Sequence, residues 1–156
     1  MGMMYSANFG AVAVTAAQDV FEIVAPSDCI VVIHELAIEQ SSDAGDAQAE
    51  MLRIQSIKGY TVSGSGGSSV TPTKMETGFP ASGVTVEANN TTVANTGSPV
   101  TLFDRAFNVQ IGFFWQPTPE CRLILSPGER LVFRIPAPAD SLTLQGTVLF
   151  EEVGGS

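Results

Sequence analysis

The chain has 156 residues, and its sixteen aspartates and glutamates outnumber its seven lysines and arginines to give a formal net charge of −9. Nucleic-acid binding depends on clustered basic residues, and the seven bases are scattered along the chain, so nucleic acid is not expected as a partner. No apolar run approaches the roughly 20 residues of a membrane-spanning helix, so a membrane partner is not expected either.

The length fits one domain, residues 1–156, whose main pattern is the alternation of apolar and polar residues. Residues 1–10 lie ahead of the clear strands and are expected to form an apolar N-terminal arm that carries Met3, Met4, Tyr5 and Phe9. The strands expected after it are residues 11–14, 20–24, 29–40, 50–58, 107–115, 123–125, 130–135 and 142–150. Residues 153–156 are expected to be a flexible tail.

Two of these strands show a feature beyond the alternation of apolar and polar residues. In residues 29–40 the first half is apolar at both odd and even positions, which is typical of a strand covered on both faces. In residues 142–150, Gly146 falls on the inner face. A glycine there predicts a bulge or the close approach of another backbone.

Residues 60–100 have a different composition, rich in Ser, Thr, Gly and Asn, with Phe79 as the one aromatic residue after Tyr60. A connection of this length in a compact domain is usually functional or disordered, and it is expected to be a long polar loop region with short β-like pieces at 84–86 and 91–93. No segment combines a helical period with a cap and a stop, and the nearest candidate is 44–52. About eight strands separated by turns predict an all-β fold, an antiparallel β-sandwich.

Residues that carry chemistry are sparse. The single histidine, His34, shares its parity with Ile30 and Leu36 and is expected to point into the core, with no nucleophile or orienting acid nominated beside it. Asp43 and Asp46 lack the further ligands of a calcium loop, so residues 42–46 are expected to be a turn.

Cys29 and Cys121 match no zinc-binding spacing, and each lies in an apolar run. They are expected to be buried thiols, with a bridge between them as the alternative. The glycine-serine run at 63–69 is followed by a proline rather than by a helix with a lysine, so it is not a phosphate loop. The sequence therefore predicts no catalytic residue, metal site or cofactor, and the protein is not expected to be an enzyme.

Five segments spread over nearly the whole chain resemble a family of small proteins encoded by tailed bacteriophages and prophages: VAVTAAQD (12–19), QSSDAGDAQ (40–48), GSGG (64–67), NNTT (89–92) and PADSLT (138–143). The resemblance implies a virion structural protein, most plausibly a capsid decoration (cement) protein on the capsid exterior, assembled in the bacterial host cytoplasm. It further implies a sandwich of jelly-roll type, the major capsid protein as partner and a homo-oligomer, a trimer.

Under this hypothesis the partner contacts are expected from the arm and the long loop, with Met4, Tyr5, Phe9 and Phe79 as candidate residues. The alternative within the virion is a tail or baseplate component. Outside the virion, the alternatives are a carbohydrate-binding β-sandwich, which should expose aromatic side chains on one face or at its loop tips, and then a sandwich enzyme.

Overall fold

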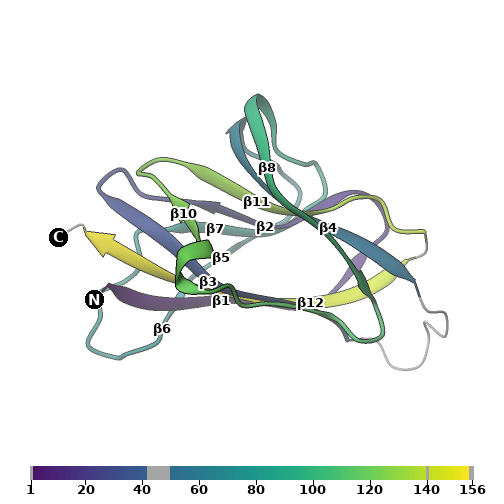
Figure 1. The fold of residues 1–156 in the computed structure, drawn as a ribbon, viewed down its shortest axis with the longest axis horizontal. Helices are drawn as coiled ribbons and strands as arrows, with labels where there is room; N and C mark the ends of the chain where they lie inside the picture. The colour runs from purple at the N-terminus through teal and green to yellow at the C-terminus, as the bar shows by residue number, and fades with distance from the viewer. Residues whose placement is uncertain (1, 42–49, 140, 155–156) are drawn as a thin grey trace.

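The chain folds into two antiparallel β-sheets, and the expected all-β sandwich is confirmed (Figure 1). The computed structural model describes residues 2–41, 50–139 and 141–154. Its elements are β1 (Met3–Val14), β2 (Gln18–Val24), β3 (Cys29–Gln40), β4 (Met51–Val62), β5 (Ser68–Val70), β6 (Thr73–Lys74), β7 (Thr85–Asn90), β8 (Asn95–Asn108), β9 (Phe113–Trp115), the short 3₁₀ turn η1 (Pro119–Cys121), β10 (Leu123–Leu125), β11 (Arg130–Ile135) and β12 (Leu142–Gly154).

The two sheets have different strand orders. Sheet A runs β10-β3-β12-β1-β6, with β9 pairing β3 beyond the end of β10. Sheet B runs β5-β7-β2-β11-β4-β8. If β1, β2, β3, β4, β8, β10, β11 and β12 are numbered one to eight, sheet A reads 1-8-3-6 and sheet B reads 2-7-4-5.

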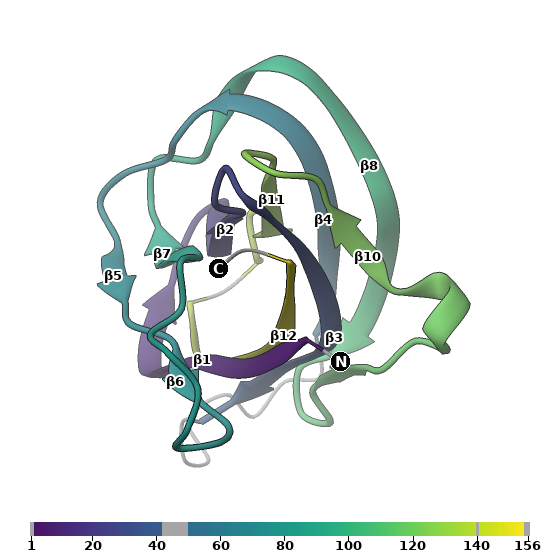
Figure 2. The same cartoon turned by 90° about the vertical axis from the view of Figure 1, so that its left-hand side faces the viewer.

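The core lies between the sheets, which face each other when the molecule is viewed along its long axis (Figure 2). Alternate residues of each strand point inward because successive side chains of a strand point to opposite faces. The largest buried side chains come from both sheets and include Tyr5 and Phe150 from sheet A and Phe21 and Phe133 from sheet B. Burial of each such side chain contributes roughly 1.5–3 kcal/mol.

Residues 1–10 were expected to form an arm, but residues 3–10 belong to β1, which lies between β12 and β6 in sheet A. Tyr5 is fully buried and stacks on Phe150 of β12, with the ring centroids 5.8 Å apart. Small residues such as Ala, Ser, Asn and Gly fill much of this strand, so its sequence shows little alternation. Pairing with β12, rather than local pattern, makes it a strand.

His34 was expected to point inward, and the structure places its side chain on the outer face of sheet A. The pairing of β3 with β12 shifts register around this residue, since Ile33 pairs with Phe150 while Glu35 pairs with Leu149. One extra residue in β3 reverses the parity, so Ile30 is exposed whereas Leu36 and Ile38 are buried.

The expected strand 107–115 is interrupted by a turn. β8 ends at Asn108, residues 109–111 form a turn followed by Gly112 with a positive φ of 90°, and β9 begins at Phe113 in the other sheet. Ile111, expected on the inner face, is 84% exposed at this turn.

Gly146 was expected to mark a bulge or the close approach of another backbone, but the nearest atoms belong to side chains. A Cβ atom on Gly146 would lie 2.6 Å from Cε1 of Phe9 and 2.8 Å from Cδ1 of Ile38. Phe9 pairs with Gly146 just before a register shift in β1, so its ring occupies the space that Gly146 leaves.

About half of the expected loop region, residues 60–100, is in strands, and the rest is loop and turn. This segment contains β5, β6 and β7, together with the end of β4 and the first part of β8. At the C-terminus, β12 extends through Gly154, so residues 153 and 154 of the expected tail are also in a strand. The expected turn at 42–46 and most of the helix candidate at 44–52 lie outside the described residues.

The two cysteines are not bridged, and they differ in exposure. Cys29 is buried at the start of β3, as expected, and burial raises the pKa of its thiol. Cys121 is exposed because it lies in the turn η1 and not in a strand.

Candidate functional site

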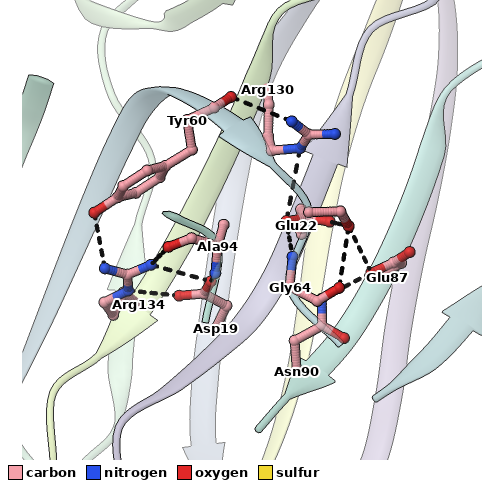
Figure 3. A network of polar contacts seen from close by, with 10 residues as sticks. Asp19, Glu22, Tyr60, Gly64, Glu87, Asn90, Ala94, Arg130 and Arg134 are labelled. Carbon is pink, nitrogen blue, oxygen red and sulfur yellow. Dashed lines mark hydrogen bonds and ion pairs between the residues drawn. The ribbon is translucent and has the colours of Figure 1, made fainter. Parts of the chain in front are cut away.

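A buried ion pair anchors the outer face of sheet B, the side away from the core (Figure 3). The carboxylate of Asp19 on β2 is fully buried and accepts two hydrogen bonds from Arg134 on β11, Nε at 2.7 Å and Nη2 at 3.2 Å. The guanidinium also donates to the carbonyl of Ala94 at 2.9 Å and to the hydroxyl of Tyr60 at 2.8 Å. Burial of the guanidinium would by itself lower the pKa of Arg134. The contacts with Asp19 and Tyr60 outweigh this effect and raise the pKa.

A second buried acid, Glu22, lies on the same strand as Asp19, three residues further along β2 (Figure 3). It accepts hydrogen bonds from the Ser63 hydroxyl at 2.5 Å and the Gly64 amide at 3.0 Å, and Arg130 lies 3.7 Å from it. Burial raises the pKa of Glu22, and the nearby charge of Glu87 adds to this effect, so that the two hydrogen bonds and Arg130 do not bring it back to its usual value.

This network fastens two chain segments onto sheet B. Tyr60 lies near the end of β4, Gly64 belongs to the segment after β4, and Ala94 lies just before β8. A small apolar cluster of Ile57, Ala94 and Val132, with Tyr60 packed against it, lies beneath them. Each charged side chain of the network contacts at least one neighbour, and these contacts stabilise the fold.

Three of the four candidate contact residues are used inside the molecule. The Tyr5 hydroxyl donates to the carbonyl of Pro80 at 3.1 Å, and Phe79 packs on the Tyr5 ring at 6.2 Å. Phe9 packs edge-on against Phe21 at 5.2 Å. Met4 is half-buried, and its pairing with Glu151 places it on the outer face of sheet A.

The segment that carries Phe79 is held by Glu152, which is 5% exposed. Its carboxylate accepts hydrogen bonds from the Ser82 hydroxyl and from the amides of Gly83, at 2.9 Å, and Val84, at 3.3 Å. This buried acid is therefore also structural.

One hollow of the surface, about 300 Å³ in volume, is lined by Asn8, Phe9, Gly10, Ala37, Glu39, Gln145, Gly146 and Thr147. Within the described residues, no three His, Cys, Asp or Glu side chains gather as a metal site would require. In the same part of the chain, no helix is long and apolar enough to cross a membrane.

The outer face of sheet A carries the clearest candidate for a binding surface. Ile30, Ile124 and Val153 are 40%, 53% and 40% exposed, and Val32 between them is half-buried. They are neighbours across three strands, because Val153 pairs with Ile30 and Ile124 pairs with Val32. We call these four residues the open face. Contiguous exposed apolar residues of this kind mark interaction sites more often than isolated ones do.

Charged groups border the open face, and most of them are paired. Glu151, which pairs with Val32 in the sheet, accepts a hydrogen bond from the Gly2 amide at 2.7 Å and contacts Nε2 of His34 at 2.8 Å. Burial alone would raise the pKa of Glu151, but these contacts outweigh it and lower the pKa.

At the edge of the open face, Lys58 reaches across from sheet B. Its ammonium donates to the carbonyl of Ile124 at 3.0 Å and pairs with Glu129 at 3.2 Å. Arg122, one residue before β10, has a buried Nε without a hydrogen-bond partner in the described part of the chain.

The sequence held one signal for the open face. Residues 29–33 are apolar at both parities, which predicted a strand covered on both faces. The structure covers one of those faces and leaves Ile30 and Val32 on the other. The ion pairs on sheet B had no such signal, because Asp19 and Arg134 are 115 positions apart.

The fold and this surface define the protein as an antiparallel β-sandwich with an apolar patch on one outer sheet face. No protein-family model and no curated protein matches its sequence. Among solved structures it is similar to VP17, a capsid protein of bacteriophage P23-77, with 11% sequence identity, 95% of this chain and 88% of that chain covered, and a TM-score of 0.20. A TM-score of this size does not establish a shared fold.

Proposed function

We propose that this protein is a non-enzymatic structural subunit of a bacteriophage virion, which binds the outside of the capsid lattice and stabilises it. The observation that carries the proposal is the open face, because a surface of exposed β-branched residues suits assembly with another protein. The phage-like segments of the sequence indicate which kind of assembly this would be, a bacteriophage virion.

The strand order supports a jelly-roll type of sandwich. Two sheets ordered 1-8-3-6 and 2-7-4-5 are what two successive Greek keys produce, and jelly rolls occur in viral capsid and lectin domains. Analogy of fold narrows the set of possible functions but does not assign one of them.

The same strand order would suit a carbohydrate-binding module, so exposed aromatic residues discriminate between the two proposals. Among the described residues, Phe114 is the one aromatic side chain with high exposure, at 62%. Trp115 beside it is 9% exposed and packs on Phe103 in the core. An isolated phenylalanine favours the capsid proposal over sugar stacking.

The decisive experiment uses phage heads that lack the protein. Such heads should lose their DNA at a lower temperature than complete heads, and purified protein should restore them, because many modest contacts over a symmetric lattice add in avidity. Recovery of the protein only in tail fractions would replace the capsid proposal with the tail or baseplate alternative. Saturable binding to a glycan would favour the carbohydrate-binding alternative.

A further inference from the structure

Residues 75–83 connect β6 of sheet A to β7 of sheet B, and we call this segment the strap. Phe79 and Ser82 are half-buried, and the other residues of the strap are exposed. Segments with few buried apolar contacts and an exposed backbone open at a lower free energy than core strands do. The strap is therefore a candidate for movement independent of the two sheets.

The strap contacts the sandwich through a small set of attachments. At its first end, the Met75 amide donates a hydrogen bond to the carbonyl of Met4 at 3.0 Å. In its middle, Phe79 packs on the ring of Tyr5, and the Tyr5 hydroxyl donates to the carbonyl of Pro80 at 3.1 Å. Both attachments are to β1, the strand beside β6.

The last end of the strap is held by the carboxylate of Glu152 on β12. Its Oε1 atom accepts hydrogen bonds from the Ser82 hydroxyl, from the Gly83 amide at 2.9 Å and from the Val84 amide at 3.3 Å. Hydrogen bonds to an ionised acceptor are stronger than those between neutral groups. Loss of this one carboxylate therefore removes the strongest attachments of the strap together.

The strap also forms part of the cover over a buried thiol. A hollow of about 150 Å³ has Pro80, Ala81 and Gly83 of the strap in its lining. Cys29 and Glu152 line the same hollow, and Cys29 is 4% exposed. When the strap lifts, this side of the hollow opens to solvent.

We propose that the strap opens from the folded sandwich as a separate unit, with the Glu152 carboxylate as its latch, and so controls access to the thiol of Cys29. The pairs of β1 with β12 and of β12 with β3 contain no residue of the strap, so both sheets keep their register when it opens. The inference concerns the isolated chain and does not depend on the capsid proposal.

The test is alkylation of Cys29 by iodoacetamide in the folded full chain, followed by mass spectrometry. Cys121 is exposed and is replaced by Ser throughout, so that one thiol remains. The dependence of the labelling rate on urea reports how much surface each opening exposes. Strap opening should give a rate that is nearly independent of urea at low concentrations and exceeds the rate that global unfolding allows. A rate that follows global unfolding from zero urea upward overturns the inference.

Glu152→Ala removes the latch and should raise the labelling rate of Cys29 without urea by about 100-fold, because hydrogen bonds to a charged group are lost. Glu76→Ala is the matched control, since the Glu76 carboxylate accepts a hydrogen bond from the Gly78 amide within the strap at 2.9 Å. This control should label at the native rate. A folded Glu152→Ala that labels at the native rate, or an equal rise in both variants, contradicts the role of the latch.

Tyr5→Phe is a milder variant that keeps the buried ring and removes the hydrogen bond to Pro80. It should raise the labelling rate of Cys29 by about two- to tenfold. Circular dichroism checks that each variant is folded, and if Glu152→Ala is not, an unchanged rate in Tyr5→Phe overturns the inference. Hydrogen exchange gives a second measurement, in which the Gly83 amide of the native chain should exchange faster than the core amides of β12. Exchange at the same rate as those amides would also contradict separate opening.

Discussion

At the scale of the residue, Asp19 is the acid whose loss should cost most. Asp19→Ala leaves the largely buried guanidinium of Arg134 without its counter-charge, and breaking a buried pair typically costs about 3–5 kcal/mol. We expect a drop of this size in the free energy of unfolding, measured by urea titration. Asp104→Ala breaks the exposed pair with Arg53 and is the control, with a midpoint almost unchanged. Equal effects of the two variants would contradict the structural role of the network.

Gly146 offers a second test at this scale. Gly146→Ala puts a methyl group 2.6 Å from the Phe9 ring, and overpacking of this kind typically costs about 1–3 kcal/mol. Gly10→Ala in the same sheet meets no atom within 4 Å and is the matched control. Thermal unfolding should show a lower midpoint for Gly146→Ala alone, and similar midpoints for the two variants would argue against the packing of Phe9 described above.

At the scale of the element, Glu22 links the segment after β4 to sheet B, and its pKa makes that link depend on pH. The pKa is raised in the folded state, so above the ordinary glutamate pKa of about 4.3 the folded chain holds more proton than the unfolded chain. The contribution of Glu22 to the free energy of unfolding is therefore lost as the pH rises through its folded pKa.

Glu22→Gln removes this dependence. Relative to the native chain, the variant should gain stability as the pH rises above the ordinary glutamate pKa of about 4.3, measured by urea titration at each pH. Carboxylates that do not interact with Glu22 titrate in the same way in both proteins and cancel in the difference. A difference that stays constant with pH, or changes in the opposite direction, would show that the pKa of Glu22 is not raised.

Deletion of residues 2–9 tests the placement of β1. An arm would be dispensable, whereas this segment fills the space between β12 and β6 and contributes Tyr5 to the core. The shortened chain is expected to lack a cooperative thermal transition by circular dichroism. Substitution of exposed Asn8 by Ser leaves the strand in place and should unfold as the native chain does. A folded deletion variant would restore the arm hypothesis.

Strands in which large apolar residues recur were predictable from the sequence, and a strand segment made largely of small residues was not. Residues 29–40 and 130–135 were placed with the bounds that β3 and β11 have, because large apolar residues recur in them. Residues 3–10 of β1 were missed because small residues there give little contrast between the faces, whereas residues 11–14 were predicted as a strand. His34 was assigned to the wrong face because a bulge changes the parity of a strand without a mark in the sequence. The apolar residues of the open face could be recognised in the sequence. The sequence does not show whether such residues are covered by another part of the chain or by a partner.

At the scale of the whole molecule, the two sheets are expected to unfold as one unit. The first and last strands, β1 and β12, are neighbours in sheet A, and successive strands often alternate between the sheets.

The single tryptophan, Trp115 on β9, reports on the contact between the sheets because its ring lies 5.4 Å from that of Phe103 on β8. Unfolding followed by tryptophan fluorescence and by far-UV circular dichroism should therefore give coincident transitions. Fluorescence that changes well before circular dichroism would mean that sheet A separates from sheet B first, and that the shared core does not couple them.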